Sequence, residues 1–194
     1  MWTDRLLCRS RPSTTSKWNN LLGMAIARCV SQRKLTERVW AQHRAEAAQF
    51  LERGDEFRAD EKVIACLKER AALGAYTEIQ EYCEEVIDNL QLIEQVKSKE
   101  CPQELKEAVC SLIYTALKCS EFVELEKVKK MFEKKFGSDF VNSVSTNLSG
   151  IGSQLLELLS NPVPPRPARV KYMVEIAKDF NLNWTPATES TSTV

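Results

Sequence analysis

The sequence is poor in the residues from which catalytic and metal centres are usually built. It contains one histidine, His43, and seven cysteines, an odd number with no Cys-x-x-Cys pair. Structural zinc sites need clustered thiolates and imidazoles, and a disulfide framework needs an even set of paired cysteines. We therefore expect no metal site and no disulfide scaffold, with the cysteines serving as small apolar residues in a reducing compartment.

The sequence also lacks long hydrophobic runs and an excess of charge. Its longest apolar stretch, Leu21–Ala27, is far shorter than the roughly 20 residues of a membrane-spanning helix. Lys plus Arg and Asp plus Glu each number 27, so net charge predicts no general attraction to nucleic acid or membrane. Only 6 Gly and 7 Pro among 194 residues, with 43% hydrophobic residues, exclude collagen-like and wholly disordered chains.

The charges are nevertheless distributed unevenly along the chain. Residues 1–70 carry 14 basic and 9 acidic side chains, whereas residues 71–130 carry 7 and 12. One interpretation is a basic face on the first helix that contacts an anionic membrane or a partner, and the other is pairing with the acidic helix that follows. Nucleic acid is not an expected partner, because aromatic residues do not alternate with the cations. The residues of the predicted basic face are Lys17, Arg28, Arg33, Lys34, Arg38 and Arg44.

Helical periodicity dominates the first half of the sequence. Apolar or small residues recur at steps of three and four from Leu22 to Phe50, interrupted at Arg33 and His43, and predict a helix that ends near Leu51. Gly54 and Asp55 then supply a stop and the next N-cap. A second helical pattern continues to Val96, so we expect a long antiparallel hairpin.

Shorter helices are expected in the second half. Pro102 is predicted to begin a third helix, and Ser120 to cap a fourth that Gly137 closes. Short helical pieces follow at 140–144 and 155–159, and a last helix follows the linker 161–167. This linker has P-x-x-P spacing, which fits a stiff spacer or a ligand of an SH3-type domain. No segment alternates with a period of two, so the predicted fold class is all-α.

No arrangement of side chains predicts catalysis. His43 is the only candidate base for a Cys–His pair and lies within a helical apolar pattern, which favours a packed, half-buried histidine. Gly150 and Gly152 have dinucleotide-like spacing but follow no strand. We therefore expect no enzyme, no cofactor and no small-molecule substrate. The carboxylates fit a solvated helical face: Glu78, Glu81, Glu84 and Glu85.

Four sequence blocks carry a family resemblance: KECP at 99–102, SLIY at 111–114, KCS at 118–120 and EKKFG at 133–137. Together with IAKDFNLNW at 176–184, they resemble the increased-sodium-tolerance family of ESCRT-III-like proteins. The resemblance extends from about Trp18 to Trp184.

This resemblance implies an elongated two-helix hairpin with shorter helices packed against it. It also implies a non-enzymatic adaptor for endosomal sorting and multivesicular-body protein transport, cytoplasmic and peripheral on endosomes. Such an adaptor binds ESCRT-III subunits and modulates the AAA ATPase that disassembles them. By analogy, a groove between the hairpin and the later helices would accept a partner's amphipathic segment. The candidate groove residues are Tyr82, Glu84, Leu112, Tyr114, Met173 and Val174.

Some departures from the family pattern limit what the resemblance implies. A mixed run at 59–64 replaces a basic run, and Leu117 and Val123 stand where prolines are common. No ATPase-docking motif follows the last helix, so contact with the ATPase is expected to be only indirect. The predicted domains are a basic disordered arm at 1–18, an ESCRT-III-like domain at 19–184 and a Ser/Thr-rich tail at 185–194.

Three alternatives remain on sequence grounds. The first is a membrane-surface or filament-scaffold protein that acts through the basic face. The second is an organellar helical protein with a cleaved basic leader at 1–18. The third is a coiled-coil homodimer that uses the apolar pattern of the first helix as its seam.

Overall fold

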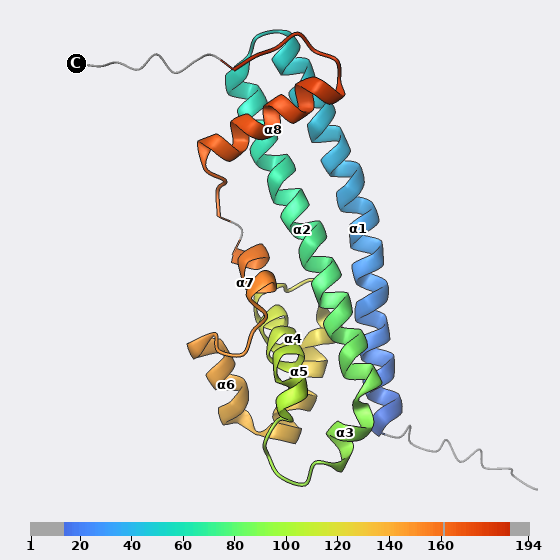
Figure 1. Cartoon of the computed structure of the whole chain (residues 1–194). Coiled ribbons are helices and arrows are strands. Elements are labelled where there is room, and N and C mark those ends of the chain that lie inside the picture. The colour runs from blue at the N-terminus through green and yellow to red at the C-terminus, as the bar shows by residue number, and fades with distance from the viewer. Residues whose placement is uncertain (1–13, 161, 187–194) are drawn as a thin grey trace, which may run out of the picture. The chain divides into compact units, whose positions relative to one another are not determined.

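The structure is a computed structural model that describes residues 14–160 and 162–186 (Figure 1). The predicted all-α fold class is confirmed for these residues, which contain helices and no strand. The rest of the predicted arm and tail, residues 1–13 and 187–194, lies outside the described residues. The helices are α1 (Thr14–Glu52), α2 (Glu56–Asp88), α3 (Leu90–Gln95), the 3-10 turn η1 (Gln103–Leu105), α4 (Lys106–Lys118), α5 (Val123–Phe136), α6 (Ser138–Asn147), α7 (Ser153–Ser160) and α8 (Arg166–Asp179).

The chain divides into two compact units. Unit 1 comprises Met1–Arg28 and Ile79–Gly152, and unit 2 comprises Cys29–Glu78 and Ser153–Val194. Helices α1 and α2 each contribute one part to unit 1 and one part to unit 2. Each unit therefore has its own packing.

Unit 1 is built around large aromatic side chains. The ring of Trp18 on α1 lies 4.8 Å from that of Phe132 on α5, and Phe132 stacks on Phe136 at 6.1 Å. Trp18 is only 3% exposed, so this part of the chain is anchored in the core of unit 1. Helix α1 begins before it, at Thr14. The predicted arm therefore ends earlier than residue 18.

Helix ends in unit 1 differ from the sequence prediction at three places. The second helix stops at Asp88 instead of continuing to Val96, and the Asn89 side chain donates a hydrogen bond to the Glu85 carbonyl oxygen (2.9 Å). Pro102 precedes a 3-10 turn and not an α-helix, and α5 is capped by Phe122 in place of Ser120. Asparagine competes with the helix through such local bonds, which explains the break at 89.

The Gly150–Gly152 segment serves packing in unit 1. The Gly152 amide donates to Ser111 Oγ (3.0 Å), and a Cβ at this glycine would collide with the Tyr82 hydroxyl. That hydroxyl donates to Glu107 Oε1 (2.9 Å). Gly152 therefore permits a close approach between segments, which accounts for its place in the sequence.

Unit 2 contains the turn of the helical hairpin. The Asp55 side chain accepts a hydrogen bond from the Arg58 amide (3.1 Å), which confirms Asp55 as the N-cap of α2. Gly74 lies within an unbroken α2, and a Cβ there would come within 3.2 Å of the Leu158 methyl groups. The missing side chain at 74 therefore lets α7 pack closely on α2.

Candidate functional site

Helix α8 is held on the hairpin by a core of mostly small residues in unit 2. Figure 1 shows α8 lying across α1 and α2 near the turn that joins them. Small side chains on α1 and α2 allow the larger side chains of α8 to approach. The buried core residues are Ala47, Ala48, Leu51, Ala59, Val63, Cys66, Tyr172, Met173 and Ile176.

Polar contacts surround this core. Trp40 Nε1 donates to the Tyr172 hydroxyl (3.0 Å), and Arg169 Nε donates to Asp60 Oδ1 (2.8 Å). Arg44 forms an ion pair with Asp179 near the end of α8. The Arg44 guanidinium also lies 5.3 Å from the centre of the Trp40 ring, within cation–π range. Helix α8 is thus attached by hydrogen bonds and ion pairs as well as by apolar packing.

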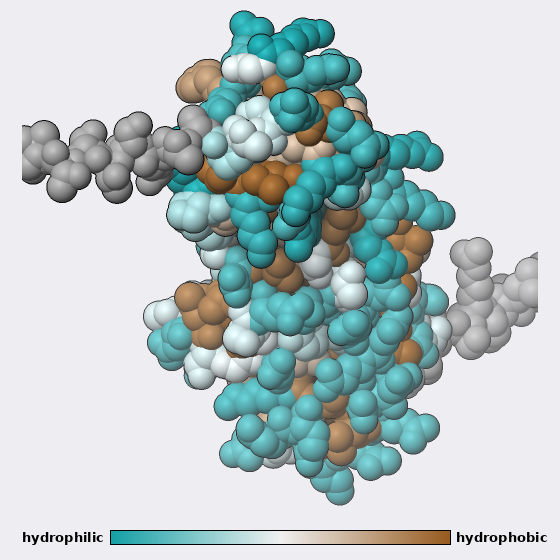
Figure 2. Space-filling view, turned by 45° about the horizontal axis from the view of Figure 1, so that its top comes forward, coloured by the Kyte–Doolittle hydropathy of each residue, from teal (hydrophilic) through white to brown (hydrophobic). Residues whose placement is uncertain are grey.

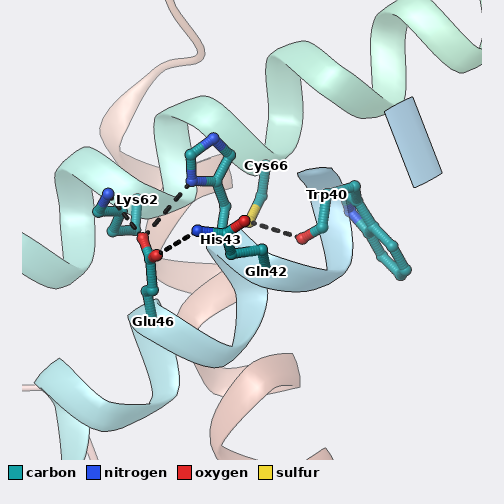
Figure 3. A network of polar contacts seen from close by, with 6 residues as sticks. All are labelled: Trp40, Gln42, His43, Glu46, Lys62 and Cys66. Carbon is teal, nitrogen blue, oxygen red and sulfur yellow. Dashed lines mark hydrogen bonds and ion pairs between the residues drawn. The ribbon is translucent and has the colours of Figure 1, made fainter. Parts of the chain in front are cut away.

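A second polar network links α1 and α2 in unit 2 (Figure 3). Glu46 forms an ion pair with Lys62 Nζ (2.7 Å) and accepts a hydrogen bond from Gln42 Nε2 (2.9 Å), and His43 Nδ1 lies 3.7 Å from its carboxylate. The hydrogen bond from Lys62 is the main cause that lowers the pKa of Glu46 to about 2. His43 is half-buried, as predicted. The network holds the two helices together beside α8.

The thiol in this region is not activated for nucleophilic attack. Cys66 Sγ donates to the Trp40 carbonyl oxygen (3.9 Å), as Figure 3 shows. Burial raises the pKa of Cys66 to about 11, so the thiol stays protonated near neutral pH. Within 14–160 and 162–186, no three or more His, Cys, Asp or Glu residues gather closely enough to hold a metal ion.

An open cleft lies beside α8 in unit 2 and is the candidate functional site. Its volume is about 770 Å³, within the range of ligand sites. Figure 2 shows apolar surface exposed among hydrophilic side chains in the upper part of the view, where α8 lies. The cleft is lined by Glu56, Phe57, Asp60, Arg166, Pro167, Val170, Lys171, Met173, Trp184 and Pro186.

The lining combines apolar contact surface with charges of both signs. Phe57, in the first turn of α2, leaves 74% of its surface exposed, and Val170 on α8 is half-buried. Glu56 lies on α2, whereas Arg166 and Lys171 lie on α8. An amphipathic segment could bury its apolar side in this cleft while its polar groups meet the charges.

Most of the six predicted groove residues do not line this cleft. Leu112 and Tyr114 are buried in the core of unit 1, with 1% and 5% exposure. Tyr82 is also buried and bonded to Glu107, whereas Glu84 is exposed on α2. These four residues belong to unit 1, and none of them lines the cleft of unit 2.

Only the predicted residues on α8 lie at or next to the cleft. Met173 lines it, and Val174 is its half-buried neighbour in the helix. Sequence reasoning missed Phe57, Val170 and Trp184 as lining residues. The available signal for Phe57 was its position, a large apolar residue in the first turn of a helix, close to the N-cap. Helix ends are less completely packed by neighbouring elements than helix centres, so an apolar residue there is a candidate for an exposed contact.

The six predicted cations do not form one basic face. At 100° per residue, Arg33 and Arg44 lie on one side of α1, and Lys34 and Arg38 lie about a third of a turn away. Arg44 is paired with Asp179, and Arg33 donates to Thr77 Oγ1 (3.5 Å). The prediction of one basic face on the first helix is therefore corrected.

The cations at the start of α1 belong to unit 1 and have different surroundings. Arg28 makes a two-point contact with Glu124 on α5, at 2.8 and 2.6 Å. Lys17 is exposed beside a small cleft. Arg28 therefore pairs with a carboxylate of α5 and not with the acidic second helix that the second interpretation of the charges named. Among the described helices, none is sufficiently long and apolar to cross a membrane.

The fold and sequence match characterised proteins over most of their length. The fold matches a crystal structure of the Ist1 N-terminal domain of Saccharomyces cerevisiae in complex with the Did2 MIM motif, with a TM-score of 0.81. The match covers 93% of this chain and 97% of that one at 24% identity. The chain is also 26% identical over 184 residues to the vacuolar protein sorting-associated protein IST1 of the same yeast.

That alignment covers 92% of this chain and 62% of the yeast protein, so the chain spans under two thirds of its relative. Residues 19–183 match the family described as "Ist1: Regulator of Vps4 activity in the MVB pathway". This range agrees with the limits predicted from the sequence blocks. The chain therefore belongs to the Ist1 family of regulators of Vps4 activity in the multivesicular-body pathway.

Proposed function

We propose that this chain is a non-enzymatic adaptor that binds an amphipathic helical segment of an ESCRT-III subunit in the cleft beside α8. The observation that carries the proposal is the cleft itself, with exposed apolar side chains bordered by acidic and basic groups. The yeast Ist1 domain of the same fold was crystallised with the Did2 MIM motif, which supports a peptide as the ligand.

The cleft has the features of a helix-binding groove. Phe57 and Val170 can lose apolar surface to a partner, and each fully buried apolar side chain contributes about 1.5–3 kcal/mol. Glu56 and Lys171 offer charges of opposite sign to the polar side of the same segment. Burial would supply the affinity, and these charges would select the register of the bound helix.

The proposed adaptor acts on the ATPase indirectly. The family is described as a regulator of Vps4 activity. Binding ESCRT-III subunits would change the substrate that the ATPase meets, without a direct contact between the two proteins. On this proposal the chain works in the cytoplasm, at the surface of endosomes.

A binding titration tests the proposal. The full chain is titrated against fluorescent peptides from the C-terminal segments of a panel of ESCRT-III subunits. We expect Phe57→Asp and Val170→Asp to weaken binding at least tenfold, equivalent to about 1.4 kcal/mol. Leu35→Asp is the matched control, since Leu35 is 55% exposed on α1 and does not line the cleft. Equal binding by all variants, or no binding to any peptide, would refute the proposal.

The alternative function is a membrane-surface or scaffold role through α1, and it depends on fewer cations than the sequence indicated. In unit 2, the exposed cations of the predicted basic face are Lys34 and Arg38. Sedimentation with vesicles that contain anionic lipid tests it. Loss of sedimentation in Lys34→Glu/Arg38→Glu would support the membrane role, and unchanged sedimentation would exclude these two side chains.

A further inference from the structure

The chain between α7 and α8 consists mostly of proline. Residues 162–165 read Pro-Val-Pro-Pro and lie outside the helices, and Arg166 follows as the first residue of α8. We call residues 162–165 the proline segment. It belongs to unit 2, and Figure 1 shows extended chain at this place between the two helices. None of its four residues lines the cleft beside α8, so the proposed function does not account for them.

The proline segment has polyproline II geometry where it meets α8. Pro165 has a φ of −63° and a ψ of 152°, close to the polyproline II values of about −75° and +145°. Val163 and Pro164 each precede a proline, which disfavours helical backbone at both positions. A polyproline II helix has three residues per turn and rises about 3.1 Å per residue. Pro162 and Pro165 therefore lie on the same edge of the segment, about 9 Å apart.

One edge of the segment is held against unit 2 by Arg169 of α8. Arg169 Nη1 donates to the Pro164 carbonyl oxygen (2.9 Å), and Nε of the same guanidinium donates to Asp60 Oδ1 on α2 (2.8 Å). The Arg169 amide also donates to the Pro165 carbonyl oxygen (3.2 Å). Pro164 is half-buried at this place. The extended conformation is thus fixed by contacts with two helices of the same unit.

The other two edges of the segment are exposed. Pro162 and Pro165, which share an edge, are both exposed, and Val163 on the next edge leaves 62% of its surface exposed. Arg166 adds an exposed positive charge directly after the second of these prolines. A spacer requires only stiffness. It does not require an exposed apolar side chain between two outward prolines with a cation beside them.

We propose that the proline segment, together with Arg166, is a ligand for an SH3-type domain of a partner protein. Such domains hold a polyproline II ligand with P-x-x-P spacing in an aromatic-lined groove, and Pro162 and Pro165 supply this spacing. Arg166 can pair with a carboxylate beside the groove, which selects a domain with an acidic rim. Because the segment is already extended and anchored by Arg169, binding has less conformational entropy to remove than it would in a flexible peptide.

Nuclear magnetic resonance titration of the full chain tests the proposal. The chain is labelled with 15N and titrated with a panel of purified SH3 domains that have acidic residues beside the aromatic groove. Val163 carries the only backbone N–H among residues 162–165, since prolines have none. The amide signals of Val163 and Arg166 should shift and saturate with at least one domain. No shift of either signal at about 0.5 mM of every domain would overturn the proposal.

Proline replacement makes the test specific. P162A/P165A should weaken binding at least tenfold, because it removes both prolines of the exposed edge. Pro186→Ala, at an exposed proline of unit 2 outside the segment, is the matched control and should bind like the parent chain. Val163→Asp keeps every proline and should also weaken binding at least tenfold, and circular dichroism checks that each variant remains folded. Binding by folded P162A/P165A or Val163→Asp that equals the parent's would overturn the proposal.

Charge reversal tests the role of Arg166. Arg166→Glu should weaken binding at least tenfold, whereas Lys171→Glu makes the same change at another exposed site of α8 and should have no effect. An equal loss in the two variants would assign the binding to general electrostatics and overturn the proposal. So would saturable binding of purified WW domains when no SH3 domain of the panel binds, since that result assigns the prolines to another class of domain.

This proposal and the proposed function can fail separately. P162A/P165A should bind the ESCRT-III peptides like the parent chain, because neither proline lines the cleft. Phe57→Asp, which changes the cleft, should bind the SH3 domain like the parent chain. Loss of SH3 binding in Phe57→Asp would place the domain in the cleft and overturn the assignment to the proline segment.

Discussion

Units 1 and 2 share the same two long helices but are stabilised in different ways. In unit 1 the packed elements meet through large rings, such as Trp18 against Phe132, and through an ion pair between the half-buried Arg28 and the buried Glu124. In unit 2, α8 meets small residues such as Ala47 and Ala59 and is attached by polar contacts at its edges. The same hairpin thus supports a core with stacked rings in one unit and, in the other, a core with small residues on the hairpin and polar contacts at its edges.

The difference indicates which unit is the scaffold and which is adaptable. Burial of aromatic side chains is insensitive to salt, whereas exposed ion pairs weaken with salt and with acid. A helix held by polar contacts beside an open cleft can adjust to a ligand at lower cost than a helix locked by interdigitated rings. We therefore expect perturbations of unit 1 to affect stability most and perturbations of unit 2 to be smaller and dependent on conditions.

The largest effect is expected for Phe132→Ala in unit 1. Phe132 is fully buried between Trp18 and Phe136, and its truncation should lower the free energy of unfolding by about 3–5 kcal/mol. Urea denaturation measures the loss, and hydrogen exchange locates it in α4 and α5. Phe180→Ala, at a 41% exposed site of unit 2, is the control and should cost less than about 1 kcal/mol. If Phe132→Ala increased hydrogen exchange in α8 as much as in α4 and α5, the two units would unfold together.

A smaller effect is expected for Glu124→Ala. Glu124 is 6% exposed, and the Arg28 guanidinium chiefly lowers its pKa by hydrogen bonding. Removing the carboxylate leaves Arg28 partly hydrated, because its side chain is 33% exposed, and we expect a loss of about 2 kcal/mol. A double-mutant cycle with Arg28→Met measures the coupling in urea denaturation. Additive losses would show that the pair contributes nothing beyond its separate side chains.

In unit 2 we expect a still smaller effect for Tyr172→Phe. The substitution removes the acceptor of the Trp40 indole N–H and should cost about 1 kcal/mol. Hydrogen exchange should increase in α8 and stay constant in α5. A loss as large as that of Phe132→Ala would contradict the view that α8 is held by many weak contacts.

The smallest effect concerns acid. Glu46 has a pKa of about 2 in the folded chain against a usual value of 4.5, chiefly because Lys62 donates a hydrogen bond to it. A carboxyl with a lowered folded pKa stabilises the fold above its usual pKa and loses that contribution as the pH falls toward the folded value. Stability should therefore decline between pH 4.5 and 2 in the parent chain and decline less in Glu46→Gln. Glu37→Gln, at an exposed site of α1, is the control, and its stability should fall with pH as much as that of the parent chain. Thermal denaturation across this pH range measures the stability of all three proteins.

Much of the helical architecture could be predicted, but the helix ends and the groove could not. Recurring apolar residues predicted α1, α2 and α8, and Asp55 was found as a cap from its residue type alone. The break at Asn89 was missed because Leu90 and Ile93 continue the apolar period, and both are buried after the break. The groove residues were misplaced because an apolar residue on a helix face has the same pattern whether it lines a cleft or fills a core.

The sequence by itself determined the all-α fold class, the hairpin turn and the family, because these depend on local periodicity, caps and short sequence blocks. Tertiary structure alone decided which side chains remain accessible, since exposure depends on what packs on each face from distant parts of the chain. It buried Leu112 and Tyr114 while leaving Phe57 exposed beside α8. It also engaged Arg28 and Arg44 in internal pairs and left Lys127, Lys130 and Lys134 of α5 facing solvent.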